Sequence, residues 1–201
     1  MPSMISKEKN LAFLHLQKCG GWWVAEIINK YNFLPLNYVK NGGHLGVQDL
    51  PEGCNSFGFV RHPVSWYVSM FNFMHTVDWK IAKSSWQSLK SNNINKFIIN
   101  CQKHEKFVLG DYFNSFYGIG TDKECKLIFK FEKLEQSMND LADLYNIPMK
   151  EDIKKHINRR RNASEKTGNT TDILDARSLQ YIEISCQHIL ERFNYDLLTL
   201  E

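Results

Sequence analysis

No stretch of the 201 residues approaches the run of about 20 apolar residues that is needed to span a bilayer. The first ten residues carry charges and lack the apolar core of a secretory signal peptide. Internal repeats, linkers and low-complexity tracts are also missing. We therefore expect one domain over residues 1–201, a cytoplasmic location and no membrane span.

Strong charge of one sign is missing too. The net charge of +3 is too small to predict binding to nucleic acid, although it leaves room for a locally basic pocket for an anion. The five cysteines are odd in number and contain no C-x-x-C pair of the kind that binds zinc or performs redox chemistry. The composition predicts five free thiols, no metal site and no nucleic-acid partner.

Two short apolar segments each precede a turn and a helix. Residues 11–16 are followed by a glycine turn at 17–21, and then by apolar residues at helical spacing as far as Tyr31. Residues 56–60 are followed by Pro63, which suits the first turn of a helix. Both segments are therefore expected to be buried strands that lead into helices.

Weaker patterns cover the rest of the chain. They predict a strand over 34–39, short helices and loops over 75–120, a strand over 126–131, and helices over 134–145 and 172–193. We expect the surface that binds the acceptor to lie in residues 75–120. Alternating strands and helices predict an α/β fold: P-loop-like, three-layered, with a central mainly parallel sheet flanked by helices.

The turn that contains Lys18 has the properties of an anion site. It joins a predicted strand to a helix start, where free backbone N–H groups and the helix dipole favour negative charge. The glycines Gly20 and Gly21 let a ligand approach the backbone, and Lys18 adds a cation that could stabilise a departing phosphate oxygen. The Walker A pattern G-x-x-x-x-G-K-[ST] is missing, which disfavours an ordinary nucleoside triphosphatase.

Four segments together resemble the sulfotransferases that use 3′-phosphoadenosine 5′-phosphosulfate (PAPS), in particular the carbohydrate type. Residues 15–24, H-L-Q-K-C-G-G-W-W-V, resemble the family's 5′-phosphosulfate loop, H-[IV]-P-K-[TC]-G-G-T-[SW]. Residues 59–69, F-V-R-H-P-V-S-W-Y-V-S, resemble its 3′-phosphate motif, R-x-P followed by a serine. Residues 128–134 and 193–195 resemble the later F-E-x-L and F-G-Y signatures. The first two motifs lie about 40 residues apart, each at a predicted strand-to-helix junction.

The resemblance implies roles for individual residues. The 5′-phosphosulfate of the co-substrate PAPS would be held by the first loop, that is, by Lys18, Cys19, Gly20, Gly21, Trp22 and Trp23. Arg61 and Ser69 would hold the 3′-phosphate, since an arginine fork fits phosphate oxygens and Ser69 follows about two helical turns later. Arg161 would reach the nucleotide from the basic stretch at 154–161, although a solvated basic face is the simpler interpretation of that stretch.

Sulfuryl transfer to a hydroxyl or amine also needs a base. We expect His44, in a glycine loop after a predicted strand, to take this role, because a histidine titrates near neutral pH. A turn histidine that only caps a backbone group is the competing interpretation. His15 is expected to be buried and structural. His62 occupies a position of the motif at which the side chain varies, so it is not expected to be the base. Glu26 is an alternative base by position.

The predicted function is therefore in-line transfer of a sulfuryl group from PAPS to an acceptor, a carbohydrate or small metabolite. Lys18 and His44 would be the catalytic residues. Two departures leave other functions open: Gln17 replaces the family's proline, and Trp22 replaces a hydroxyl residue that donates to the 5′-phosphate. A non-catalytic PAPS-fold binding protein is one alternative, and a kinase-like nucleotide-binding P-loop protein is another.

Aromatic side chains supply further candidates. Trp66, Trp79 and Trp86 could stack on adenine or on a sugar face, but aromatic residues at helical spacing are more often part of a core. The sequence predicts neither the acceptor nor the oligomeric state.

Overall fold

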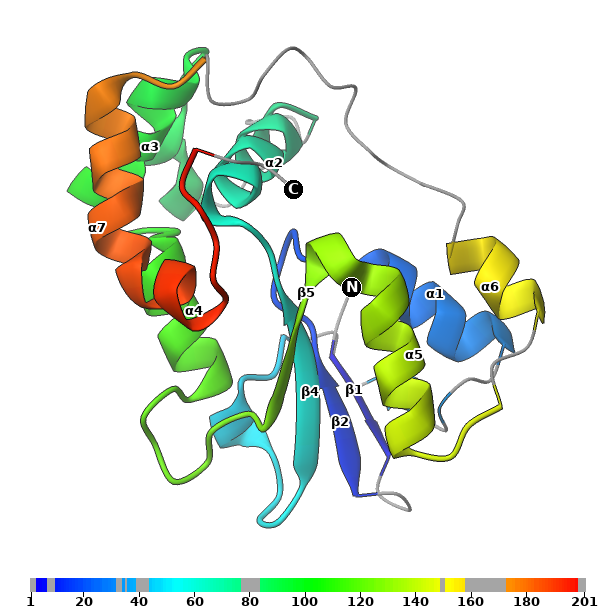
Figure 1. The fold of residues 1–201 in the computed structure, drawn as a ribbon. Helices are drawn as coiled ribbons and strands as arrows, with labels where there is room; N and C mark the ends of the chain where they lie inside the picture. The colour runs from blue at the N-terminus through cyan, green and yellow to red at the C-terminus, as the bar shows by residue number, and fades with distance from the viewer. Residues whose placement is uncertain are drawn as a thin grey trace. The chain divides into compact units, whose positions relative to one another are not determined.

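The computed structural model describes residues 3–6, 10–31, 34, 36–38, 44–76, 84–148, 151–157 and 173–198 (Figure 1). The chain divides into two compact units. The first consists of residues Met1–Arg61 and Phe113–Asn162, and the second of His62–Tyr112 and Ala163–Glu201.

The five strands found among the described residues belong to one sheet of the first unit. They are β1 (Met4–Ser6), β2 (Leu11–Leu14), β3 (Asn37–Tyr38), β4 (Asn55–Val60) and β5 (Leu127–Lys130). Their order is β3-β1-β2-β4-β5. The pairs β2–β4 and β4–β5 are parallel, whereas β1 runs antiparallel to β2 and to β3, so that every strand except β1 points the same way. The predicted α/β fold with a mainly parallel sheet flanked by helices is confirmed.

The central strands are buried, and β2 is wholly apolar while β4 is polar only at Asn55 and Ser56, which is typical of parallel strands covered on both faces. Every residue of β2 is buried, and so is β4 from its second residue onward. Phe13 stacks on Phe57 with a ring separation of 5.2 Å, and Phe59 contacts Phe129 at 5.7 Å. These rings form the core of the first unit, on the segments that the sequence predicts as strands.

The antiparallel edge of the sheet differs from expectation. β1 was not predicted, since its three residues are too few to produce a period. Its register pairs Met4 with Phe13 and Met4 with Tyr38. Within the predicted strand at 34–39, the described residues Asn37–Tyr38 form β3.

Three helices of the first unit lie together on one side of the sheet in Figure 1. They are α1 (Gly21–Tyr31), α5 (Leu134–Leu144) and α6 (Glu151–Ile157). A 3₁₀ turn, η1 (Val47–Asp49), precedes β4, and another, η3 (Phe131–Lys133), joins β5 directly to α5. The loop after β2, the residue after β4 and the turn after β5 therefore all follow the carboxyl ends of parallel strands, which is where ligands bind in such sheets.

The second unit is helical. It contains α2 (Pro63–Thr76), η2 (Ser84–Leu89), α3 (Ile94–Lys103), the first part of α4 (Leu109–Tyr117) and α7 (Ala176–Arg192). Helices α2, α3 and α7 pack against one another. Asn93 and Asp175 cap α3 and α7 through side-chain bonds to Lys96 N–H and Ser178 N–H. The predicted start of α2 at Pro63 is confirmed.

Two predicted features lie outside the described residues: Trp79, and the arginines Arg159, Arg160 and Arg161. All five cysteines are free thiols, as expected. In the part of the chain that the structure describes, none of the helices combines the length and the apolar character required to cross a membrane.

Candidate functional site

The loop between β2 and α1 is a tight turn with unusual backbone angles. Lys18 has φ of 64°, in the left-handed region that residues other than glycine rarely adopt, and Gly20 has φ of 75°. The N–H of Cys19 donates to the carbonyl of Leu16 at 3.3 Å, and the N–H of Trp23 donates to the carbonyl of Gly20 at 3.0 Å. These bonds close the turn and start α1 at the residue after Gly20.

The N-terminus of α1 presents free donors. Among the described residues, no acceptor is bonded to the backbone N–H groups of Gly20, Gly21 and Trp22. Unpaired N–H groups of this kind are normal in the first turn of a helix, and they bind anions readily. The N–H of Trp23 is already bonded within the turn, so binding of an anion through this group would require that bond to open.

Residues from two other strand ends meet the loop. Arg61 follows β4, and its Nη1 donates to the carbonyl of Lys18 at 3.4 Å. The guanidinium carbon of Arg61 also lies 5.0 Å from the ring centre of Phe131, in the turn after β5. The same ring packs against Gly20, where a Cβ atom would lie 2.6 Å from Phe131 Cδ2. The structure thus joins Arg61 to the Lys18 loop.

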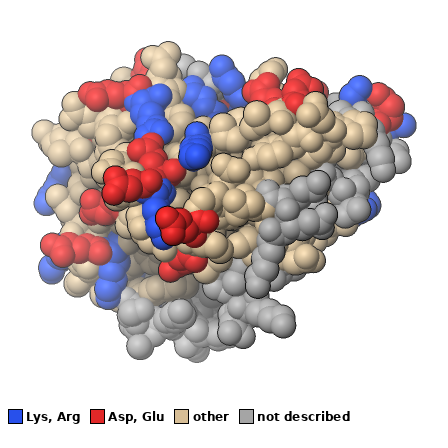
Figure 2. Space-filling view, turned by 90° about the horizontal axis from the view of Figure 1, so that it is seen from below, with Lys and Arg blue, Asp and Glu red and all other residues tan. Residues whose placement is uncertain are grey.

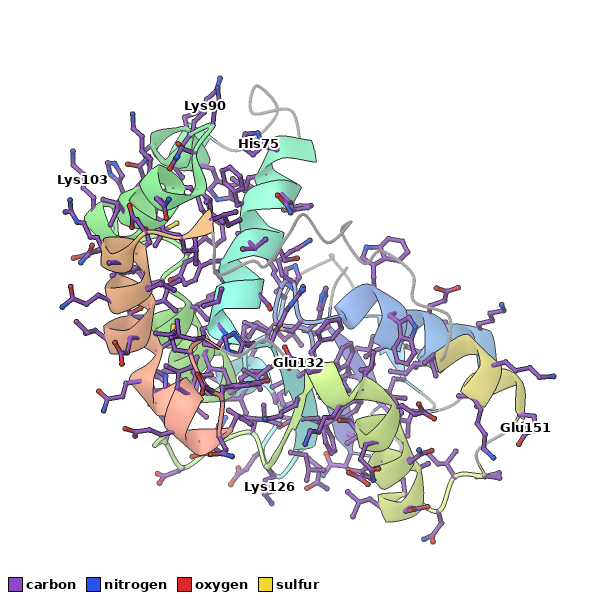
Figure 3. All side chains as sticks on the ribbon, turned by 45° about the horizontal axis from the view of Figure 1, so that its top comes forward. His75, Lys90, Lys103, Lys126, Glu132 and Glu151 are labelled. Atoms are coloured by element: carbon purple, nitrogen blue, oxygen red, sulfur yellow. The ribbon has the colours of Figure 1, made fainter. Side chains whose placement is uncertain are left out.

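Burial and charge both act on the loop. Burial lowers the pKa of Lys18 below its ordinary value, and the nearby charge of Arg61 lowers it further. Burial raises the pKa of the Cys19 thiol, which keeps it protonated and unreactive. Glu132 follows Phe131 in η3, just before α5 begins, and Lys126 precedes β5 at the opposite end of the strand (Figure 3). Two adjacent cations at the end of the sheet favour a multiply charged anion.

The two histidines His15 and His44 lie together. His44 Nδ1 is 2.9 Å from the backbone oxygen of His15, and the two rings are 5.0 Å apart. The ring of His15 in turn fills the space where a side chain of Gly21 would lie. Burial lowers the pKa of His44, although its bond to the His15 carbonyl acts in the opposite direction. His44 is therefore connected to the loop through His15, which is itself buried as predicted.

The remaining loop candidates have different environments. Trp22 is 64% exposed, whereas the indole of Trp23 is buried. Glu26 is half-buried in α1. Ser69 is half-buried in α2 and belongs to the second compact unit, while Arg61 belongs to the first. At the loop, Trp22 can therefore bind a ligand through its backbone N–H group.

Other sequence candidates are explained by ordinary structure. Trp66 is fully buried, so it is a core residue. Trp86 is half-buried in η2. Lys154 and Lys155 are exposed, and Lys154 forms a surface ion pair with Glu151 at 2.9 Å. The charged residues in Figure 2 also mix both signs at close spacing, so that no field of one sign covers the coloured part of that face.

His62, the residue after Arg61, has a packing role within the second unit. Its Nε2 lies 2.7 Å from the backbone oxygen of Asp196, and its ring contacts Tyr195 edge to face at 5.1 Å. The segment at 193–195, which resembles the family's F-G-Y ending, therefore packs against the residue that follows the R-x-P arginine. Sequence reasoning left both His62 and Tyr195 without a role.

Phe131 is the site residue that sequence reasoning missed. It lies in the segment 128–134, which was recognised by its F-E-x-L pattern, but a pattern along one segment does not reveal contacts with residues such as Gly20 and Arg61. An aromatic residue at the carboxyl end of a predicted strand was the available signal.

The fold itself is that of a sulfotransferase. The chain superimposes on a mouse sulfotransferase, SULT7A1, whose crystal structure contains PAP, with a TM-score of 0.59 over 92% of this chain and 86% of that chain. The two sequences are 14% identical, so this likeness establishes the fold, and it does not extend to the carbohydrate-type subfamily. No family model matches the sequence, and no curated protein matches it.

Proposed function

We propose that this protein is a PAPS-dependent sulfotransferase that transfers a sulfuryl group to a hydroxyl or amine of an acceptor. The observation that carries the proposal is the joining of Arg61 to the Lys18 loop at the carboxyl ends of β2 and β4. The mouse sulfotransferase of the same fold binds PAP, the product that PAPS leaves after transfer. Both compact units would then be parts of one sulfotransferase domain.

In this proposal the backbone N–H groups of Gly20, Gly21 and Trp22 hold the 5′-phosphosulfate, and Lys18 lies beside the oxygen that bridges phosphorus and sulfur. The fixed φ angles of Lys18 and Gly20 favour this use, because a preorganised loop spends little free energy on ordering when the ligand binds. Arg61 and Ser69 read the 3′-phosphate. Arg161, outside the described residues, would approach the same nucleotide.

The chemical step follows from these roles. The acceptor oxygen attacks sulfur in line with the bridging oxygen, the bond from sulfur to that oxygen breaks, and PAP leaves with the electron pair. The ammonium group of Lys18 stabilises the negative charge that grows on the leaving oxygen. The acceptor's proton passes to His44.

The geometry of His44 supports its role as the base. A carbonyl oxygen only accepts hydrogen bonds, so the contact with His15 assigns the ring hydrogen to Nδ1 and leaves Nε2 unprotonated in the neutral ring. Burial lowers the pKa of His44, so the neutral and basic form predominates at neutral pH. Since His44 is linked to Gly21 through His15, the base lies close to the loop that would hold the donor.

Calorimetric titration with PAP, ADP and ATP tests the donor assignment. We expect PAP to bind more tightly than ADP, because only PAP carries the 3′-phosphate that Arg61 and Ser69 would read. Lys18→Ala should weaken PAP binding, and Lys154→Ala, which removes an exposed lysine from a surface ion pair, serves as the control. A preference for ATP over PAP would contradict the proposal and favour a kinase-like protein.

We place the reaction in the cytoplasm, consistent with five free thiols.

A further inference from the structure

The conformation of the Lys18 loop requires support from outside the loop. A left-handed backbone at a residue other than glycine costs roughly as much as a weak hydrogen bond contributes, and it persists where neighbouring structure holds it. Lys18 has this conformation, with φ of 64°. The hydrogen bond from Arg61 Nη1 to the Lys18 carbonyl, at 3.4 Å, is long, so this bond alone is weak support.

Phe131 supplies a surface against which both Gly20 and Arg61 pack. One contact is direct, since the ring lies against the backbone of Gly20 so closely that a Cβ atom there would clash with Cδ2 and Cε2. The other contact runs through Arg61, whose guanidinium lies over the ring with its carbon 5.0 Å from the centre. A cation over an aromatic face is attracted to it, and the attraction grows when water is partly excluded.

We propose that Phe131 is a positioning residue, which holds Gly20 and Arg61 against one aromatic ring and thereby fixes the Lys18 loop in the conformation that binds the donor. As far as the donor is concerned, this inference rests on the proposed function. The effect of Phe131 on the loop itself does not depend on what the loop binds.

The ring of Phe131 acts differently from that of an ordinary core residue. Phe129, two residues earlier on β5, is also half-buried, and its ring contacts Phe59 at 5.7 Å. Phe129 therefore packs on the sheet, whereas Phe131 packs on the loop and on Arg61. The variants Phe131→Leu and Phe129→Leu each replace one phenylalanine near the end of β5 by leucine. Comparing them separates packing on the loop from packing on the sheet.

Amide hydrogen exchange of the protein without ligand provides the first test. The amides to follow are those of Cys19, Trp23 and Val24, which are bonded within the turn. Phe131→Leu should increase their exchange roughly tenfold, the size expected from losing a partly desolvated cation–π contact. Phe129→Leu should change their exchange little, even if it lowers the overall stability more. Phe131→Tyr retains the ring and should restore the protection of the wild type.

A second measurement follows the charge on Lys18, by competitive labelling of its amine at several pH values. The positive charge of Arg61 helps to lower the pKa of Lys18. If Phe131→Leu releases Arg61, the pKa of Lys18 should rise, and Phe131→Tyr should keep it low. A residue that acts only through stability would leave this pKa unchanged in the folded protein.

PAP titration of the same variants completes the design. Phe131→Leu should weaken PAP binding by roughly tenfold and Phe129→Leu by much less. Equal effects of the two leucine variants on loop exchange and on the pKa of Lys18 would overturn the inference. Failure of the wild type to bind PAP would instead overturn the proposed function, while the exchange and labelling results would still decide the role of Phe131.

Discussion

The phenolic oxygen of Tyr117 binds both backbone polar groups of Phe59. It accepts a hydrogen bond from the N–H of Phe59 at 3.1 Å and donates one to its carbonyl at 2.8 Å. Gly58 makes room for the ring, since a Cβ atom there would lie 2.5 Å from Tyr117 Cε1. Phe59 precedes Arg61 by two residues, so this contact fixes the end of the strand that carries the arginine.

Replacement of Tyr117 by phenylalanine should leave two buried backbone groups without their partner. We expect Tyr117→Phe to lower the free energy of unfolding by about 1 to 3 kcal/mol, the usual cost of leaving buried polar groups unsatisfied. Chemical denaturation measures the change. Tyr145→Phe is a suitable control, because among the described residues the half-buried Tyr145 hydroxyl makes no hydrogen bond. Equal stability of the two variants would contradict the role given to Tyr117.

Lys18 should act mainly on the transition state, since the charge on the bridging oxygen grows as sulfur departs. Lys18→Ala should lower turnover by roughly a hundredfold or more, the scale of losing one preorganised electrostatic group. Burial and Arg61 lower the pKa of Lys18, so turnover of the wild type should decline at a pH below the ordinary lysine value of 10.5. Turnover rates and PAP affinity, measured side by side, check this. A loss of affinity with unchanged turnover would disprove the transition-state role.

Arg61 has two expected partners: the loop carbonyl of Lys18 and the 3′-phosphate. Arg61→Ala should weaken PAP by roughly tenfold to a hundredfold, as expected for a hydrogen bond to a charged group, and should weaken adenosine 5′-phosphate much less. Arg192→Ala is a matched control, because Arg192 also lies over a phenylalanine ring, at 5.9 Å from Phe193. Equal weakening of both nucleotides by Arg61→Ala would restrict Arg61 to supporting the loop.

The sheet and its first helices could be predicted from the sequence because their signals are local. Buried parallel strands are continuous apolar runs, and Pro63 marks the start of α2 at the predicted residue. β1 was missed since three residues carry no period, and it becomes a strand only through pairing with β2 and β3.

The candidate site also has a part that the sequence predicts and a part that it does not. The Lys18 turn follows from local sequence, whereas the contacts of Phe131 with Gly20 and Arg61 join segments more than a hundred and about seventy residues apart, which no local pattern reveals.

His44 leads to a prediction for both stability and activity. Its folded-state pKa lies below the ordinary value of 6.5, mainly because of burial. The unfolded chain therefore takes up a proton first as the pH falls below 6.5, and the free energy of unfolding decreases until the pH passes the lowered folded-state pKa. His188, whose pKa is also lowered by burial, adds to the effect in the wild type.

The variant His44→Asn isolates the contribution of His44. Its stability should depend less on pH between neutral and acid conditions than that of the wild type. As the proposed base, His44 should also matter for rate, so His44→Asn should lower turnover by about 10²-fold to 10⁴-fold and remove the acid limb of the rate profile. An unchanged rate with the expected change in stability would leave His44 as a structural residue and direct the search for the base to Glu26.

Trp22 occupies the position where the resembled loop has a hydroxyl residue, and it decides whether the protein is active or a degenerate binding protein. The indole is 64% exposed, so it does not fill the loop, and the backbone N–H of Trp22 remains a free donor among the described residues. We expect the wild type to bind PAP, and Trp22→Thr to bind it more tightly by about 1 kcal/mol, the net value of one added hydrogen bond. Calorimetry on both proteins measures this difference, and Trp22→Ala separates the effect of the new hydroxyl from that of removing the indole. Crystals soaked with PAP give the structural answer, with nucleotide expected at the Lys18 loop in the wild type. If PAP bound only to the Thr and Ala variants, the indole would be blocking the site, and the protein would be a non-catalytic member of the fold.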